Sequence, residues 1–278
     1  MAASFLVVPQ WQGSGSSRAM RLVDGAEAIR GDLPSATTRV VAVPLESGDS
    51  QGTTVHRLSS IALVRDRVAQ ALAENEGPAI LIGGDCGVEL AGLDSVSDRD
   101  VAVVWFDAHP DLNTPESSPS HAFTGMVLRT ALGDGPAQLV PSTPLSPSRI
   151  VLVGTRSVDA AEDEYIAQNG VRSVGVDGFS AEALIAAVEA TGAASVYVHI
   201  DLDVLDPGEF TGIGYPEPFG LSAGDLVDAL KALLVRFPLA GAGITEFAPA
   251  SVDAAVDDLP TILRIVGALA TASTEAAS

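Results

Sequence analysis

The sequence predicts an α/β fold, a single domain in which helices cover both faces of an eight-stranded, mostly parallel sheet. Short apolar runs alternate with longer amphipathic segments along the chain, as in proteins with parallel sheets. The apolar runs are made of Val, Ile and Ala with little alternation of polar residues, which is typical of strands buried on both faces. The 278 residues, 47% of them apolar, suffice for one large core, and neither repeats nor an obvious linker interrupt them.

The first half of the chain shows this alternation clearly. Apolar runs predict strands at residues 4–8, 40–44, 79–82 and 101–106. Amphipathic patterns predict helices at residues 17–30, 56–74 and 123–132. Residues 46–54 and 113–121 are polar and rich in Gly, Ser or Pro, so we expect loops there.

The second half continues in the same way. Strands are predicted at residues 150–153, 171–176, 195–200 and 241–245. Helices are predicted at residues 160–169, 181–190, 222–237 and 260–270, and Ser222 has the side-chain oxygen that suits the start of its helix. Residues 207–219 are rich in Gly and Pro and should form a loop, and we expect a disordered tail at residues 271–278.

The composition argues against several partners. A net charge of −21 opposes the basic surface that nucleic-acid binding requires, so we expect no nucleic acid. No apolar run reaches transmembrane length, and residues 1–10 lack the basic start and long apolar core of a signal peptide, so we expect no membrane partner. The single cysteine, Cys86, allows no intrachain disulfide and fits a reducing cytoplasm, where we expect the protein to be.

Polar residues that the fold does not require follow four of the predicted strands. They are Asp85 and Cys86, then Asp107, His109 and Asp111, then Asp201 and Asp203, and finally Glu246. A single acid after a strand is usually a helix cap, but the carboxyl ends of parallel strands meet at one ligand-binding edge. So many carboxylates there would repel each other without cations. Two divalent ions sharing aspartates, about 3.5–4 Å apart, would neutralise them, and oxygen-rich ligands favour Mn²⁺ or Mg²⁺ over Zn²⁺.

Three motifs at these strand ends resemble the signatures of the ureohydrolase family, which includes the arginases and agmatinases. The motifs are Gly-Gly-Asp at 83–85, Asp-Ala-His-Pro-Asp-Leu-Asn-Thr at 107–114, and His-Ile-Asp-Leu-Asp-Val-Leu-Asp-Pro at 199–207. The resemblance covers residues 40–250 and implies an arginase-like fold, a small guanidino substrate and two Mn²⁺ ions that supply hydroxide for attack on the guanidino carbon. It leaves open whether the protein is a monomer or a homo-oligomer.

The resemblance also implies roles for single residues. Asp107 and Asp201 would bridge both ions, His109 and Asp203 would complete one ion, and Asp111 and Cys86 would complete the other. Glu246 matches the glutamate that holds the guanidinium. Asn113 and Ser120 match positions that bind the α-carboxylate in arginases, and Asp159 and Glu162 match those that meet the α-amino group. This set favours an amino acid over a decarboxylated substrate, because unmatched polar groups discriminate strongly, although such residues are also common in loops.

Two residues depart from the family pattern. Cys86 stands where the family usually has histidine, and it is either a thiolate ligand, which suits Mn²⁺ poorly, or an inert buried thiol. Thr124 stands on the family's catalytic histidine and cannot shuttle protons at neutral pH. His121 would replace that histidine only if the loop bends inward; the alternative is a surface histidine.

These departures predict the substrate. Arginine's guanidinium is strongly basic, so an enzyme without the shuttle should act on it poorly. An N-hydroxy-guanidine is less basic and more electrophilic. We therefore expect hydrolysis of Nω-hydroxy-L-arginine to L-ornithine and hydroxyurea. The alternatives are an arginase or other guanidino-acid hydrolase, and a non-catalytic binding protein of the same fold.

Overall fold

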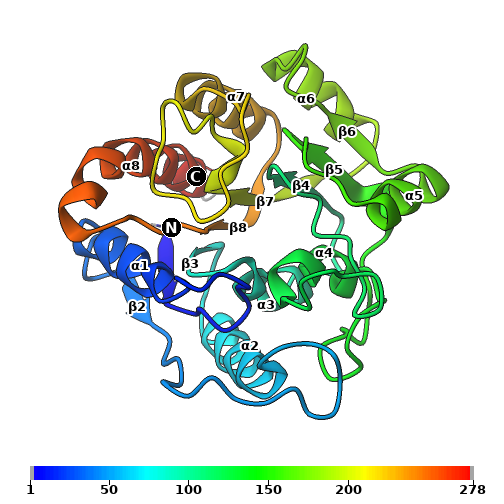
Figure 1. Cartoon of the computed structure of the whole chain (residues 1–278). Helices are drawn as coiled ribbons and strands as arrows, with labels where there is room; N and C mark the ends of the chain where they lie inside the picture. Colours follow the sequence, from blue (N-terminus) through cyan, green and yellow to red (C-terminus); the bar gives the residue numbers. More distant parts are fainter. Residues whose placement is uncertain (1–2, 276–278) are drawn as a thin grey trace.

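A computed structural model of the chain describes residues 3–275, and within them one sheet of eight strands forms the centre (Figure 1). The strand order is β2-β1-β3-β8-β7-β4-β5-β6, and every pairing is parallel. The strands are β1 (Ser4–Val8), β2 (Thr38–Val40), β3 (Ala79–Gly83), β4 (Val101–Phe106), β5 (Ile150–Val153), β6 (Arg172–Val174), β7 (Ser195–Asp201) and β8 (Leu239–Thr245). The predicted fold class is confirmed.

Two layers of helices cover the sheet (Figure 1). One core cluster joins the sheet to α1 (Arg21–Gly31), α6 (Ala181–Glu189), α7 (Ala223–Arg236) and α8 (Val252–Glu275). On the other face, two clusters join it to α2 (Leu58–Ala73), α3 (Glu89–Asp94), α4 (Val127–Ala131) and α5 (Ala160–Asn169). Among the helices of residues 3–275, none is both long and apolar enough to cross a membrane.

Strand β4 shows why the strands read as continuous apolar runs. Val103 and Trp105 pack into the cluster on the α2–α5 face, whereas Val104 and Phe106 pack into the cluster on the opposite face. All six residues of the strand are buried, so both faces need apolar side chains. The four strands with polar residues at their ends, β3, β8, β7 and β4, are also consecutive in the sheet. The fold therefore brings those polar residues to one edge.

Several predicted boundaries were wrong. The second strand is only Thr38–Val40, although the Val41 amide still donates to the Val7 carbonyl at 2.9 Å and Val41 packs in the core cluster that contains α2. The last helix begins at Val252 and contains Pro260, which the prediction had placed at a helix start. That helix continues to Glu275, and residues 276–278 of the expected tail lie outside the described part.

Candidate metal centre and substrate site

A cavity of about 220 Å³ opens at the carboxyl ends of the central strands. Most of the residues predicted for the site line it: His109, Asp111, Asn113, Ser120, Thr124, Asp159, Glu162, Asp201, Asp203 and Glu246. Asp107 and Cys86 do not line the cavity, but they are buried directly against residues that do. The structure therefore brings the predicted residues together, with His121 as the exception.

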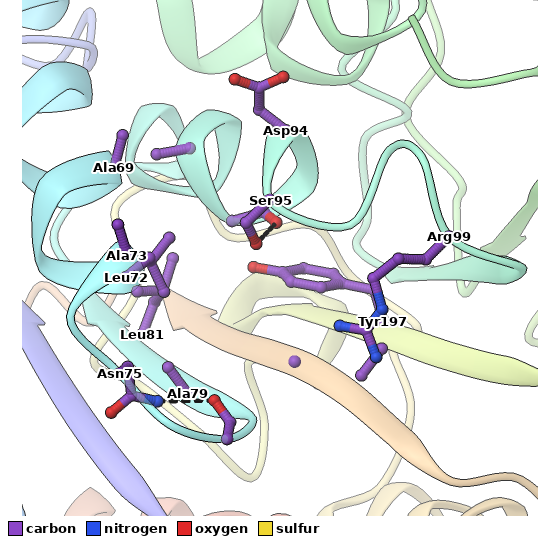
Figure 2. A pocket seen from close by; sticks show the side chains of 15 residues that line it. Ala69, Leu72, Ala73, Asn75, Ala79, Leu81, Asp94, Ser95, Arg99 and Tyr197 are labelled. Carbon is purple, nitrogen blue, oxygen red and sulfur yellow. Dashed lines mark hydrogen bonds between the residues drawn. The ribbon is translucent and has the colours of Figure 1, made fainter. Parts of the chain in front are cut away.

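A larger cavity of about 470 Å³ lies elsewhere, against α2, α3 and the starts of β3 and β8 (Figure 2). Its walls are mainly small or aliphatic side chains such as Ala69, Leu72 and Leu81, and its one acid is Asp94. Six carboxylates converge on the smaller cavity. Convergent charge, rather than volume, therefore distinguishes the chemical site.

One side of the site is built from Asp107, His109 and Asp203. The His109 Nδ1 atom lies 3.0 Å from Asp203 Oδ2 and 3.5 Å from Asp107 Oδ1. Backbone amides hold the carboxylates in place: His109 N donates to Asp107 Oδ1 at 2.6 Å, and Ala108 N donates to Asp203 Oδ1 at 3.0 Å. The turn after β4 is thus tied to the turn after β7, and every group on this side has a partner.

Charges on this side depend on one another. Burial alone would lower the pKa of His109, but Asp107 and Asp203 outweigh it and raise it to about 12. Burial opposes ionisation of Asp107, yet contacts with His109 and His199 lower its pKa to about 2. Burial and the neighbouring Asp107 raise the pKa of Asp203 to about 6. In the metal-free protein the His109 imidazolium therefore offsets one of the two negative charges of this pair.

The other side contains Cys86, Asp111 and Asp201. The Cys86 thiol is buried and donates to Asp201 Oδ2 at 3.1 Å, with Thr245 Oγ1 3.3 Å away. Burial, followed by repulsion from Asp201, raises the pKa of Cys86. Asp111 has a φ of 52°, in the left-handed region, and its buried Oδ2 has no hydrogen-bond partner in the described structure. A buried carboxylate oxygen without a partner is costly, so it calls for a cation.

The donors fit divalent ions. Among residues 3–275, three groups of side chains have ligand atoms within 4.8 Å of one another: Cys86, Asp107, Asp111 and His199; Cys86, Asp201 and Glu246; and Asp107, His109 and Asp203. Burial and neighbouring carboxylates raise the pKa of Asp111 and of Asp201, because the protein alone does not neutralise so many acids. A bound dication would reverse that effect. The orphaned Asp111 oxygen and this oxygen-rich set suit hard ions.

Glu246 lies directly after β8 and points into the cavity. Its φ is 64°, and its amide donates to the Gly84 carbonyl at 2.8 Å, which fixes the turn between β8 and β3. The Thr124 hydroxyl donates to Glu246 Oε1 at 2.9 Å. Burial raises the pKa of Glu246 to about 8, and the bond from Thr124 opposes this rise. Thr124 thus contacts the carboxylate predicted to hold the guanidinium.

Four residues form the far end of the cavity. Asn113 Nδ2 donates to Asp159 Oδ2 at 2.9 Å, and Asp159 caps α5. Glu162 accepts from the amides of Asp159 and Leu112, each at 2.9 Å, so both its oxygens are already bonded to backbone. Glu162 therefore positions Asp159 and the β4 loop, while Asn113, Asp159 and Ser120 present polar atoms to the cavity.

His121 lies outside the cavity. Its φ is 54°, and its ring packs edge-on against His56 with the ring centroids 5.9 Å apart. Its neighbours Ser120 and Ala122 line the cavity instead. This geometry does not favour His121 as a proton shuttle, because the loop turns the imidazole towards His56 rather than towards Glu246.

Three further residues, for which the motifs predicted no role, lie at the site or behind it. His199 and Glu89 are buried behind Asp107, and Tyr215 forms part of the cavity wall. His199 stands in the third motif, two residues before Asp201, and the period of a strand places it on the same side as Asp201. That spacing was a usable signal. Glu89 and Tyr215 carry no such local signal.

The fold and site together define an α/β protein that gathers candidate metal ligands at the carboxyl edge of a parallel sheet. The sequence matches the model of the arginase family over residues 19–259, and the chain belongs to that family. Members of this family are generally dependent on two metal ions and hydrolyse amidino or guanidino groups, so the chain is a hydrolase of this kind. The predicted ureohydrolase family is confirmed.

Individual relatives agree. The arginase of Entamoeba histolytica is 32% identical over 241 residues, covering 80% of this chain and 79% of the relative, and the arginase of Bacillus subtilis is 30% identical over 207 residues, covering 69% and 70%. A crystal structure of the Entamoeba histolytica arginase with L-ornithine superposes with a TM-score of 0.86 at 24% identity, covering 96% of this chain and 97% of that one. Proclavaminate amidino hydrolase from Streptomyces clavuligerus has a TM-score of 0.75 at 22% identity, covering 98% and 91%.

Proposed function

We propose that this protein is a binuclear manganese amidinohydrolase that converts Nω-hydroxy-L-arginine and water into L-ornithine and hydroxyurea. The observation that carries the proposal is Thr124, whose hydroxyl donates to Glu246 Oε1 at 2.9 Å. Among the described residues that line the cavity, His109 is the one histidine, and its Nδ1 faces Asp203. No imidazole therefore stands beside Glu246 to move protons to a strongly basic leaving amine.

The substrate's chemistry compensates for this loss. The oxygen of an N-hydroxy-guanidine withdraws electrons, so the group is less basic than the guanidinium of arginine and its carbon is more electrophilic. The combination of Cys86 and Thr124 in an arginase-like site also resembles the Nω-hydroxy-L-arginine amidinohydrolase of D-cycloserine biosynthesis. Both points support the hydroxylated substrate over arginine.

In this mechanism the chain's own residues bind and orient the substrate. Glu246 pairs with the guanidino group, and Thr124 fixes the direction of that carboxylate. Asn113, Ser120 and Asp159 bind the α-carboxylate and α-amino group at the far end. Cys86, Asp107, His109, Asp111, Asp201 and Asp203 would hold two Mn²⁺ ions, which when bound supply a nucleophile from water near neutral pH.

Steady-state assays of the Mn²⁺-loaded protein on the two substrates test the proposal. We expect kcat/KM for Nω-hydroxy-L-arginine to exceed that for L-arginine by more than about tenfold, with ornithine and hydroxyurea formed in equal amounts. The Asp107→Asn variant gives the background rate. Faster turnover of L-arginine would overturn the substrate assignment and favour an arginase, the activity of the named relatives. Turnover of neither compound at full metal loading would favour the non-catalytic binding protein.

A further inference from the structure

A fully buried group of polar side chains lies behind Asp107, away from the cavity. His199 on β7 and Glu89 at the start of α3 are both completely shielded from solvent. The imidazole lies between two carboxylates: its Nδ1 is 3.7 Å from Glu89 Oε2, and its Nε2 is 3.8 Å from Asp107 Oδ2. These separations are electrostatic contacts rather than hydrogen bonds.

Trp105 contacts both His199 and Asp107. Its ring stacks on the His199 ring with centroids 3.6 Å apart and an interplanar angle of 20°. Its Nε1 donates to Asp107 Oδ2 at 3.1 Å. The Asp107 oxygen that points away from His109 is therefore contacted by Trp105 and by His199. The other oxygen, Oδ1, accepts from the His109 amide.

The surroundings are shaped to hold Glu89. The Tyr197 hydroxyl donates to Glu89 Oε2 at 2.8 Å, and Tyr197 also forms part of the wall of the larger cavity in Figure 2. Gly243 on β8 leaves the space that Glu89 fills, since a Cβ atom at that position would overlap Glu89 Oε1. Glu89 is thus enclosed by α3, β7 and β8.

Burying two carboxyls and an imidazole opposes folding, because each loses its hydration. The packing of Trp105 and Tyr197 does not by itself explain why these carboxyls and this imidazole are buried there. We propose that His199, held by Glu89, is a positioning residue that directs Asp107 Oδ2 towards the ion on the Cys86 side of the centre. His199 belongs to the same group of possible ligand atoms as Cys86, Asp107 and Asp111. The inference rests on the proposed metal centre and adds residues that support its ligands from behind.

Two variants test this role by metal binding. His199→Asn removes the imidazole, and Glu89→Gln keeps the shape of its partner but removes the charge. We expect each to weaken one of the two Mn²⁺ ions by 10–100-fold, roughly the loss seen when an outer partner of a metal ligand is removed. Stepwise titration calorimetry measures both affinities, and the electron paramagnetic resonance spectrum should change from a coupled pair to a single ion.

A matched control separates positioning from folding. Asp258 is a buried carboxylate in α8 that accepts from the Thr211 amide and hydroxyl, each at 3.3 Å, away from the cavity. Asp258→Asn should lower the melting temperature and leave both Mn²⁺ affinities unchanged. If His199→Asn and Glu89→Gln behave like this control, the positioning role is overturned. Should His199→Asn fail to fold, Glu89→Gln decides.

The same titration separates this inference from the proposed function. A wild-type protein that binds two Mn²⁺ ions but hydrolyses no guanidino compound refutes the proposed function, and the variants still test the positioning role. A wild-type protein that binds no Mn²⁺ overturns both.

Discussion

The two sides of the candidate metal centre are held in different ways. On the side of His109, the imidazole contacts Asp107 and Asp203, and backbone amides bond the same carboxylates. On the side of Cys86, a thiol occupies the position that faces Asp201, and one oxygen of Asp111 has no partner among the described residues. On the first side every polar group has a partner within the protein, whereas on the second side one carboxylate oxygen has none.

This difference shows where the chain has changed. The family motif at residues 107–114 supplies residues to both sides, Asp107 and His109 to the first and Asp111 to the second, and gives no hint of a different substrate. Cys86 and Thr124 both stand outside that motif, and both face the part of the site where Asp201 and Glu246 lie. The proposed substrate would therefore require no change in the scaffold, only in Cys86 and Thr124 beside the shared ligands.

Asp107 belongs to both sides, so its loss should have the largest effect. Asp107→Asn keeps the size of the side chain but removes its charge. We expect at least one Mn²⁺ ion to bind more than 100-fold more weakly, beyond the roughly 10–100-fold typical of outer partners, and turnover to fall with it. Elemental analysis of bound metal and a rate assay measure this, with Asp258→Asn as the control. Retention of both ions at wild-type affinity would place the centre elsewhere.

The unbalanced acids predict a pH dependence in the metal-free protein. Burial, reinforced by neighbouring carboxylates, raises the pKa of Asp203 from 3.8 to about 6 and that of Glu246 from 4.5 to about 8. The folded state therefore binds more protons than the unfolded chain between these values. Its free energy of unfolding falls as the pH rises from about 4 to about 8.

Metal binding must displace those protons, so the apparent Mn²⁺ affinity should rise about tenfold per pH unit for each proton released. Melting curves of the metal-free and Mn²⁺-loaded protein between pH 5 and pH 8 should diverge as the pH rises. Curves that stay parallel would show that these carboxyls are already ionised before the metal binds.

Cys86→His should make the two sides more alike. An imidazole suits Mn²⁺ better than a thiolate, so we expect the affinity of one ion to rise by about tenfold, or ~1.4 kcal/mol. The ratio of arginine to hydroxyarginine turnover should rise as well. Cys86→Ser is the control, since it also removes the thiol without adding an imidazole. No change in either quantity would place residue 86 outside the metal shell.

The sequence predicted the candidate ligands of both sides well for a physical reason. Buried parallel strands need apolar residues on both faces, so the polar residues after 79–82, 101–106, 195–200 and 241–245 were conspicuous. The carboxyl edge of a parallel sheet then brings them together. All four strands exist and are adjacent in the sheet; residues 101–106 match β4 at both ends, and each of the other three differs at one end by one or two residues. The candidate metal ligands and Glu246 could therefore be identified from local sequence patterns.

The role of Glu89 and the orientation of His121 could not be predicted in this way. Glu89 begins a six-residue helix that is too short for a periodic pattern, and it meets His199 only because α3 packs under β7. His121 stands three residues before Thr124, yet its positive φ directs the ring towards His56. Contacts between distant segments and backbone turns of this kind depend on tertiary packing. The predicted start of the last helix was wrong for a related reason, since proline is common in the first turn of a helix but Pro260 lies inside α8.

Thr124→Val should produce the smallest effect and concerns the other departure from the family. Valine has nearly the same shape but cannot donate to Glu246 Oε1. Loss of that bond should raise KM for the guanidino substrate by about 2–10-fold, or ~0.5–1.5 kcal/mol, with a smaller change in kcat.

The Thr124 hydroxyl also lowers the pKa of Glu246. Its removal should therefore raise that pKa further and move the pH dependence of kcat/KM to higher pH. Thr191→Val, whose hydroxyl bonds the Val188 carbonyl far from the cavity, is the control. An unchanged pH profile would mean that Thr124 does not tune Glu246, and that the missing imidazole alone separates this site from its relatives.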